Sequence, residues 1–267
     1  MLGEEIVKVC VGGKLPDVGI IVFTLTCNAV EVGGGGDFVG GTREKALDSI
    51  SFSLKKGESL GIIGPTGCGK TTVVNLLLRF YDADEGSIIV GGRDVKNYDK
   101  DDLRRRFGVV FQNDMVFRDT LRNNIDLGRG YTDDELIAAT KDAQAFEYID
   151  SLDLGLDHKA DIKGANLSGG QKQRLLVARA LAGRPEILIL DDSSSALDYK
   201  TDAEMRRAIR ENHKDSTLIL IAQRVSSVMN MDKIMVMDNG MCAGYGTHSE
   251  LMENCSAYRD TYEMQTS

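Results

Sequence analysis

Residues 59–71 read SLGIIGPTGCGKT, an apolar run that passes into a glycine-rich loop and then into a lysine and a threonine. Residues 64–71 fit the pattern G-x-x-x-x-G-K-S/T at every defined position. The apolar run predicts a buried strand over residues 59–63, and the pattern after the loop predicts a helix over residues 71–80. Glycines let a backbone wrap closely around phosphates, and a helix amino terminus adds partial positive charge. The stretch therefore predicts a site for a nucleoside triphosphate.

The loop assigns roles to individual side chains. Lys70 would reach the β- and γ-phosphates, and the Thr71 hydroxyl would bind Mg²⁺. Cys68 lies inside the loop, where it is either a small residue that fits or a thiol made reactive by the helix amino terminus. The alternative for the whole motif is an ordinary glycine turn before a helix. The predicted nucleotide-binding residues of this loop are Gly64, Pro65, Thr66, Gly67, Cys68, Gly69, Lys70, Thr71 and Thr72.

Short β-type runs alternate with helical patterns along the rest of the chain. Two strongly apolar strands, residues 187–190 and 217–221, flank a helical segment, and residues 114–182 are mostly helical by pattern. Residues 132–135 resemble a capping box at a helix start. This alternation predicts an α/β fold with a largely parallel sheet covered on both faces. Further predicted strands are residues 20–25, 49–54, 87–90 and 108–111.

The strand at residues 187–190 ends in two carboxylates, Asp191 and Asp192. In a protein with a phosphate loop, the first carboxylate is placed to hold Mg²⁺, directly or through water. The second carboxylate could polarise the attacking water as a general base. The alternative is a strand end that is capped by two solvated acids.

Composition restricts the class of protein. The 267 residues include 32 Lys and Arg against 41 Asp and Glu, and the net charge of −9 argues against a nucleic-acid groove. The five cysteines show no metal-ligand spacing and are expected to be reduced thiols. No stretch approaches the roughly 20 apolar residues that cross a bilayer, and residues 1–5 lack the basic start of a signal peptide. We expect residues 1–19 to be a linker or a cloning remnant.

Residues 167–171 read LSGGQ and stand between the phosphate loop and the strand that ends at Asp191. Together with those two motifs, the pentapeptide resembles the signature of ATP-binding-cassette (ABC) proteins, specifically the nucleotide-binding domain of an exporter. The resemblance covers residues 20–267. It implies a RecA-like phosphate-loop core, an N-terminal antiparallel β subdomain and an α-helical subdomain at about residues 114–182. It also implies ATP and Mg²⁺ as ligands, and hydrolysis of ATP to ADP and phosphate.

The resemblance implies a role for several further residues. Gln112 lies in a segment similar to the Q-loop and would sense Mg²⁺ and the γ-phosphate, and the residues after it would touch a coupling helix of a transmembrane domain. Phe38 sits about where the family stacks an aromatic ring on adenine. Residues 195–198, SALD, resemble the D-loop at a dimer seam. Ser168 can cap the helix that follows it. The signature residues would contact the γ-phosphate held by the opposite subunit: Ser168, Gly169, Gly170 and Gln171.

Two positions depart from the family pattern, and both belong to the predicted catalytic set with Lys70. Asp192 stands where the family usually has glutamate, and the shorter side chain would misplace the base. Gln223 stands where the family has its switch histidine, and an amide cannot carry a positive charge. Ile162 also stands where exporters commonly place a glutamate before the signature. Together these departures suggest a degenerate site of low intrinsic activity, as in one subunit of a heterodimeric exporter.

Three functions remain open at this point. The first is the ATP-hydrolysing domain of a heterodimeric exporter at the cytoplasmic face of the membrane, bound to a second nucleotide-binding domain and to transmembrane coupling helices. In that case its signature would serve the partner's ATP, while its own site hydrolyses slowly. The second is a module that only occludes ATP and regulates gating. The third is a homodimeric ATPase that tolerates Asp192 and Gln223. A soluble ABC protein of DNA repair or translation lacks support, because there is neither a second cassette nor a basic face.

Overall fold

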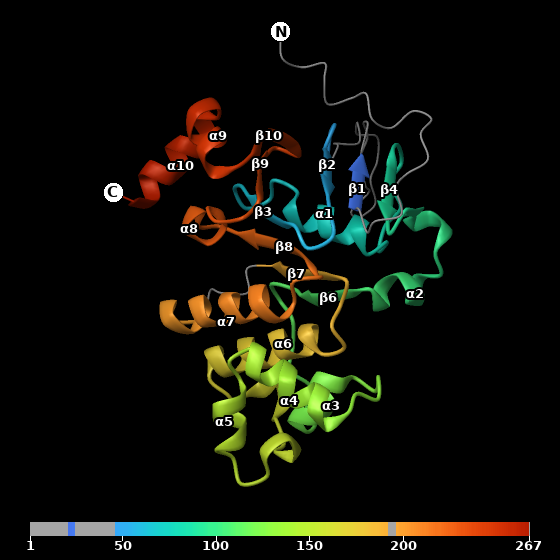
Figure 1. Ribbon diagram of the computed structural model, residues 1–267, viewed down its shortest axis with the longest axis vertical. Helices are drawn as coiled ribbons and strands as arrows, with labels where there is room; N and C mark the ends of the chain where they lie inside the picture. Colours follow the sequence, from blue (N-terminus) through green and yellow to red (C-terminus); the bar gives the residue numbers. More distant parts are fainter. Residues whose placement is uncertain (1–20, 25–45, 192–195, 267) are drawn as a thin grey trace, which may run out of the picture.

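The fold combines two β-sheets with helices that pack around them (Figure 1). The computed structural model describes residues 21–24, 46–191 and 196–266. The expected linker at residues 1–19 and the expected adenine contact Phe38 therefore lie outside the described residues. Strands and helices alternate along the described chain, which confirms the predicted α/β class.

The larger sheet has six strands in the order β10-β9-β3-β8-β7-β6. All neighbouring strands are parallel except β10 with β9, which confirms the largely parallel sheet. The sequence patterns predict four of the six strands, and β9 and β10 are additional. In chain order the strands are β3 (Ser59–Ile63), β6 (Phe107–Val110), β7 (Ile187–Asp191), β8 (Thr217–Ala222), β9 (Lys233–Asp238) and β10 (Met241–Gly246).

Both faces of the larger sheet are buried, which explains why its central strands are apolar throughout. Successive side chains of a strand point to opposite faces, so Leu188 packs in one core cluster and Ile189 packs in the other. Helix α1 (Lys70–Leu77) belongs to the cluster of Ile189, whereas α6 (Gly169–Leu181) and α7 (Tyr199–Asn212) belong to the cluster of Leu188. Helices therefore cover both faces of the sheet, as predicted.

The smaller sheet is antiparallel, with the strand order β2-β1-β4-β5, and confirms the expected antiparallel part of the fold. Burial alternates along β2, where Phe52 and Leu54 are buried while Ser51 and Ser53 are exposed. The elements of this part are β1 (Ile21–Thr24), β2 (Ser51–Leu54), β4 (Ser87–Val90), β5 (Arg93–Asp94), a 3-10 turn at Val95–Asn97 and α2 (Lys100–Arg105).

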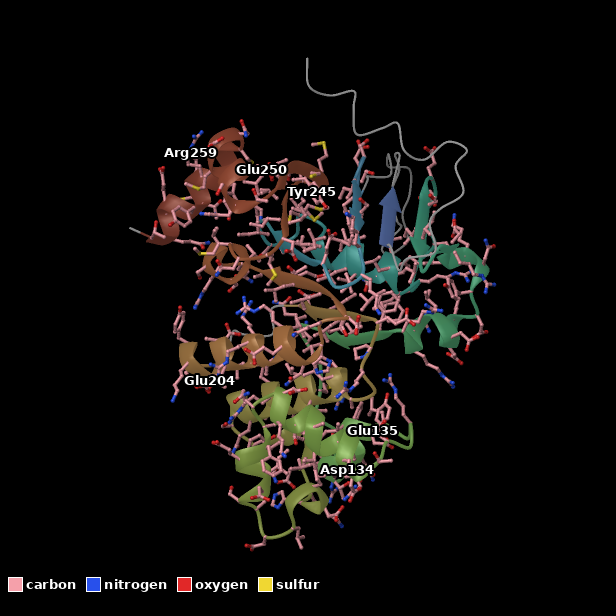
Figure 2. All side chains as sticks on the ribbon, viewed as in Figure 1. Asp134, Glu135, Glu204, Tyr245, Glu250 and Arg259 are labelled. Atoms are coloured by element: carbon pink, nitrogen blue, oxygen red, sulfur yellow. The ribbon has the colours of Figure 1, made fainter. Side chains whose placement is uncertain are left out.

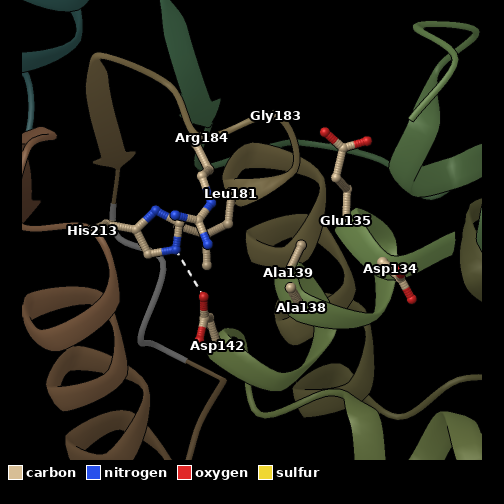
Figure 3. Close-up of a pocket in the computed structure, with 9 residues that line it drawn as sticks. All are labelled: Asp134, Glu135, Ala138, Ala139, Asp142, Leu181, Gly183, Arg184 and His213. Carbon is tan, nitrogen blue, oxygen red and sulfur yellow. Dashed lines mark hydrogen bonds and ion pairs between the residues drawn. The ribbon is translucent and has the colours of Figure 1, made fainter. Parts of the chain in front are cut away.

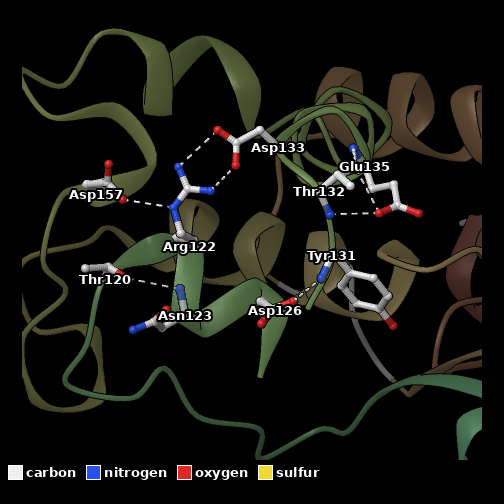
Figure 4. A network of polar contacts seen from close by, with 9 residues as sticks. All are labelled: Thr120, Arg122, Asn123, Asp126, Tyr131, Thr132, Asp133, Glu135 and Asp157. Atoms are coloured by element: carbon white, nitrogen blue, oxygen red, sulfur yellow. Dashed lines mark hydrogen bonds and ion pairs between the residues drawn. The ribbon is translucent and has the colours of Figure 1, made fainter. Parts of the chain in front are cut away.

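A helical layer lies below the larger sheet in Figure 1. Its helix α4 begins with the predicted capping box, in which Thr132 Oγ1 accepts from the Glu135 amide and the Glu135 carboxylate accepts from the Thr132 amide. Arg122 links this helix start to the 3-10 turn at Gly155–Asp157 through ion pairs with Asp133 and Asp157 (Figure 4). The layer comprises α3 (Leu121–Asp126), α4 (Asp133–Asp142), α5 (Phe146–Asp150), 3-10 turns at Gly155–Asp157 and Ile162–Gly164, and α6.

A partly buried polar contact joins the helical layer to α7 (Figure 3). His213 follows α7 at its carboxyl end, and its Nε2 lies 2.9 Å from Asp142 Oδ2. Asn212 Nδ2 donates to the other oxygen of this carboxylate at 2.6 Å. Because Asp142 is the last residue of α4, these two contacts hold the helical layer against a helix that packs on the sheet.

The last part of the chain packs beside the larger sheet. Helix α9 begins with a capping box formed by Thr247 and Glu250. Tyr258 of the next helix is fully buried, and its hydroxyl lies 2.9 Å from His248 Nδ1. Figure 2 shows Glu250 and Arg259 at this end of the molecule. The helices of this part are α8 (Val225–Val228), α9 (His248–Asn254) and α10 (Ser256–Thr266).

Candidate nucleotide-binding site

Several sequence motifs meet because their strands are neighbours in the larger sheet. Strands β3, β8, β7 and β6 are parallel, so their carboxyl ends lie along one edge, which is where ligands bind in open α/β sheets. The phosphate loop follows β3, Gln112 follows β6, Asp191 ends β7 and Gln223 follows β8. A cleft of about 180 Å³ at this edge is lined by Thr66, Gly67, Gly69, Lys70, Thr71, Thr72, Gln112, Asp191, Ile221, Ala222 and Gln223.

Two positions of the phosphate loop require glycine. Gly69, directly before α1, has a φ of +100°, which residues with a side chain rarely adopt. A Cβ on Gly64 would lie 2.2 Å from the Met237 carbonyl oxygen. Helix α1 begins at Lys70, and the first amides of a helix have no intrahelical acceptors. The loop and this helix start therefore offer backbone donors to an anion.

The Lys70 side chain folds back over the loop. Its ammonium donates to the carbonyl oxygens of Gly64 and Pro65, each at 2.7 Å, and the Cys68 sulfur lies 3.7 Å from the same nitrogen. These contacts keep the positive charge at the wall of the cleft. Cys68 is only 4% exposed and packs with the core, which favours its interpretation as a small residue that fits the loop.

Thr71 and Asp191 are in direct contact in the cleft. Thr71 Oγ1 donates to Asp191 Oδ2 at 3.3 Å, and Asp191 is 3% exposed at the end of its strand. Gln112 lines the same cleft and carries an amide oxygen. Mg²⁺ is a hard cation that takes oxygen ligands, so these three side chains fit its chemistry. Within the described ranges, no group of three or more His, Cys, Asp or Glu side chains could hold a metal ion.

The other residues predicted for this site lie outside the described residues, at the cleft, or in a second hollow beside it. Asp192, the predicted general base, lies outside the described residues, as Phe38 does. Gln223 is exposed and lines the cleft at the end of β8. Gly64 and Pro65 instead line a neighbouring hollow of about 470 Å³, to which Gln223 also contributes.

The signature residues form a helix start and do not line the cleft. Ser168 Oγ accepts from the Gln171 amide at 3.2 Å, and Gln171 Oε1 accepts from the Ser168 amide at 2.8 Å, which confirms the predicted cap of α6. A Cβ on Gly170 would lie 3.3 Å from the Ala196 carbonyl oxygen. The signature therefore packs against the segment that resembles a D-loop.

That segment leads into α7 through another cap. Asp198 accepts from the Thr201 amide at 3.0 Å and from the Thr201 hydroxyl at 2.7 Å. These hydrogen bonds lower the pKa of the Asp198 carboxyl from its ordinary value. The group is therefore ionised at neutral pH, and its charge lies at the positive end of the α7 dipole.

Comparisons with known proteins agree with this geometry. A family model described as "ABC transporter" matches residues 47–195, which is more than half of the chain. The chain belongs to the ABC transporter family. The matched residues include the phosphate loop, Gln112, the signature and Asp191, whereas Ile221, Ala222 and Gln223 of the cleft lie beyond the matched range.

Individual ABC proteins resemble the chain over most of its length. It is 42% identical over 229 residues to the ATP-dependent lipid A-core flippase of Haemophilus influenzae, a match that covers 85% of this chain and 39% of that protein. It is 40% identical over 220 residues to a putative multidrug export ATP-binding/permease protein of Staphylococcus aureus, covering 82% and 38% respectively. The chain therefore spans about two fifths of the length of these relatives.

A solved structure supports the same fold. The structure of a bacterial Atm1-family ABC exporter with ATP bound has a TM-score of 0.85 and 32% identity, and the match covers 95% of this chain and 43% of that chain. Within the described part of this ABC chain, no helix is both long and apolar enough to span a bilayer.

Sequence reasoning missed Arg179, which positions part of the site. This residue of α6 is 7% exposed and donates to Asn124 O at 2.7 Å, Met115 O at 3.1 Å and Asp114 Oδ1 at 3.2 Å. Burial lowers the pKa of its guanidinium, and the charge of Asp114 opposes that shift. Arg179 therefore holds the segment after Gln112 against α6. The available signal was a lone arginine within the otherwise apolar residues 175–182.

Proposed function

We propose that this chain is the ATP-hydrolysing nucleotide-binding domain of an exporter-type ABC transporter. The observation that carries the proposal is a single cleft that brings together Lys70, Thr71, Gln112 and Asp191 from the ends of three strands. Lysine, a hydroxyl and a carboxylate around a glycine loop are the groups that phosphate-loop enzymes use for phosphoryl transfer. The exporters named among the relatives and the solved structures support the same function.

In this proposal the phosphates of ATP lie along the loop and the start of α1. The Lys70 ammonium exchanges the Gly64 and Pro65 carbonyls for oxygens of the β- and γ-phosphates, because contacts between opposite charges are stronger than those to neutral acceptors. Thr71, Asp191 and Gln112 hold Mg²⁺, which supplies positive charge that offsets the charge of the phosphates when bound. The backbone amides of the loop complete the anion site.

The hydrolytic step is slow at this chain's own site. Asp192 acts as the general base on the attacking water, but its carboxylate stands one methylene short of the glutamate that the family usually has. A misplacement of about 1 Å can cost on the order of 100-fold in rate. Gln223 lines the cleft and can donate to a phosphate, yet it carries no positive charge.

The place of the signature supports a two-subunit arrangement. Ser168 and Gly169 are exposed and do not line the cleft of their own chain, so the start of α6 can receive a γ-phosphate held by a second domain. We propose a heterodimer in which the intact signature serves the partner's ATP. The segment after Gln112 then contacts coupling helices of an attached or associated transmembrane domain, at the cytoplasmic face of the membrane.

Single-turnover hydrolysis, with the chain in excess over ATP and Mg²⁺ present, tests the proposal. We expect a slow but measurable rate that Lys70→Ala abolishes. Asp192→Glu combined with Gln223→His should raise the rate by about 10- to 100-fold. Tight ATP binding without hydrolysis would instead support the module that only occludes ATP. Fast turnover by the unsubstituted chain at high concentration would support the homodimeric ATPase.

The assignment of the signature to the partner's ATP has its own test. In the assembled transporter, Ser168→Ala should reduce transport more than Asp192→Ala does, because the first change damages the faster composite site and the second only the slower one. The reverse order would overturn the assignment. Ser168→Thr keeps a hydroxyl for the α6 cap and is the matched control.

A further inference from the structure

The Gln265 side chain of helix α10 makes hydrogen bonds to the loop that carries Gln223. The Gln265 Nε2 donates to the Gln223 carbonyl oxygen at 2.9 Å, and Gln265 Oε1 accepts from the Val225 amide at 2.7 Å. We propose that Gln265 is a positioning residue for the switch loop, residues 223–225, and thereby for the Gln223 side chain in the nucleotide cleft. The inference rests on the proposed function, because Gln223 acts in hydrolysis only if the cleft binds ATP.

The two contacts require an amide side chain. The Gln223 carbonyl can only accept and the Val225 N–H can only donate, so their partner must present one donor and one acceptor side by side. Glutamine presents both, whereas an ionised glutamate presents acceptors alone. The Gln265 amide therefore spans Arg224 and holds the backbone on either side of it in one geometry.

The contact with Val225 also completes a helix start. Val225 is the first residue of α8, and Arg224 before it makes no side-chain cap. An arginine has no acceptor atom for this purpose, and the first amides of a helix lack acceptors within the helix. Gln265 supplies the missing acceptor from α10. Since Val225 is 1% exposed in the core, the contact joins a buried anchor to the exposed Gln223.

Helix α10 is held in a fixed place from which Gln265 can act. Tyr258 is fully buried, and Tyr258, Thr261 and Gln265 lie on one face at helical spacing. All three line the hollow of about 470 Å³, whose other lining residues include Pro65 and Gln223. Because Gln223 lines both this hollow and the nucleotide cleft, it stands between α10 and the phosphate loop.

The size of the expected effect follows from the exposure of the contact. A displacement of a reacting group by about 1 Å can cost on the order of 100-fold in rate. Gln265 is exposed, however, and a hydrogen bond that competes with water has a small net worth. Without these two hydrogen bonds, the loop would still occupy its present position for part of the time. We therefore expect losses of about 3- to 10-fold rather than the full effect.

The test uses two substitutions and a control in the full chain. Gln265→Ala removes both hydrogen bonds, while Gln265→Glu keeps the acceptor for Val225 and loses the donor for Gln223. Met264→Ala, at a neighbouring position that is 74% exposed, controls for disturbance of the end of α10. Two quantities are measured: amide hydrogen exchange at Val225, and the single-turnover rate as a function of the concentration of the chain, which is kept in excess over ATP.

We expect Gln265→Ala to speed exchange at Val225 by about 3- to 10-fold and Gln265→Glu to leave it protected. Both variants should lower the rate at saturating chain concentration by about 3- to 10-fold, with the half-saturating chain concentration changed by less than about twofold. Met264→Ala should change neither quantity. Unchanged exchange in Gln265→Ala, or unchanged rates in both variants of a chain that hydrolyses ATP, would overturn the inference.

Failure of the proposed function gives a different result. If the unsubstituted chain hydrolyses no ATP, the proposed function is overturned, and the catalytic half of this inference with it. The exchange measurement still decides whether Gln265 holds the switch loop by its hydrogen bonds, because the measurement requires no nucleotide.

Discussion

Replacement of Arg179 tests whether one buried guanidinium holds the Q-loop segment on the helical layer. The side chain makes four hydrogen bonds, to Asn124 O, Asn124 Oδ1, Met115 O and Asp114 Oδ1, and its guanidinium carbon lies 5.2 Å from the centre of the Phe117 ring. Arg179→Ala leaves the two backbone carbonyls without this donor, at about 1–3 kcal/mol each. Loss of one partner of a buried ion pair costs about 3–5 kcal/mol.

These two estimates agree on a loss of about 3–5 kcal/mol in the free energy of unfolding for Arg179→Ala. Asp114→Asn is the matched control, because the amide keeps an oxygen acceptor for the guanidinium and removes only the charge. Its side chain is 20% exposed, so water compensates part of the change. We expect a loss of about 1 kcal/mol for this variant.

Urea unfolding followed by far-UV circular dichroism measures both losses, since the chain has no tryptophan for fluorescence. ATP affinity should change little while the variant is folded, because Arg179 does not line the nucleotide cleft. A loss below about 1 kcal/mol for Arg179→Ala would refute the reasoning, as would equal losses for Arg179→Ala and Asp114→Asn. The small loss would mean that the segment is held by Asn124 and apolar contacts alone, and equal losses would mean that the charge pair with Asp114 accounts for the whole effect.

Three further predictions concern the fold and the loop thiol. Gly108→Ala places a Cβ 2.0 Å from the Ala180 carbonyl oxygen. Urea titration should therefore show a loss of about 3 kcal/mol in the free energy of unfolding. An unchanged free energy of unfolding would contradict the packing of β6 on α6. Hydrogen bonds from Thr247 lower the pKa of the Glu250 carboxyl in the folded chain. The ionised carboxylate therefore stabilises the fold fully above the ordinary glutamate pKa, and this stabilisation is lost as pH falls through the lowered folded pKa. Glu250→Gln should flatten that part of the curve of unfolding free energy against pH. Cys68 should react with iodoacetamide at least about tenfold more slowly in the folded chain than in urea, and equal rates would restore its interpretation as a reactive thiol.

Four strands of the larger sheet were predicted from their apolar runs, whereas β9 was missed although its residues 234–237 are apolar, and β10 was missed because it lacks such a pattern. Residues 187–190 form a strand as predicted. A short run that is apolar at every position is typical of a strand buried on both faces of a parallel sheet. Strand β10 (Met241–Gly246) contains two glycines and an alanine, which are depleted in strands. Its pairing with β9 comes from the tertiary fold, because β9 is already held in the sheet by β3.

The loop and the helix cap were predictable because each motif is local. Gly64 to Thr71 specify a loop and a helix start within eight residues, and Ser168 with Gln171 specifies a cap within four. Such patterns depend on backbone geometry between neighbours, which short stretches of sequence determine. The roles of Asp192 and Phe38 remain predictions, because these residues lie outside the described part of the chain.

The amino-acid sequence alone specified the phosphate loop, the strand end at Asp191 and the capped signature helix. The tertiary structure decided which of these share a cleft: the order β3-β8-β7-β6 places Lys70, Gln223, Asp191 and Gln112 along one edge, while the signature helix starts away from it. It also decided the contacts of Arg179 with Asn124 and of Gln265 with Gln223, which join residues 55 and 42 positions apart. No local pattern encodes such pairs, because they form only when separate elements pack in one relative orientation.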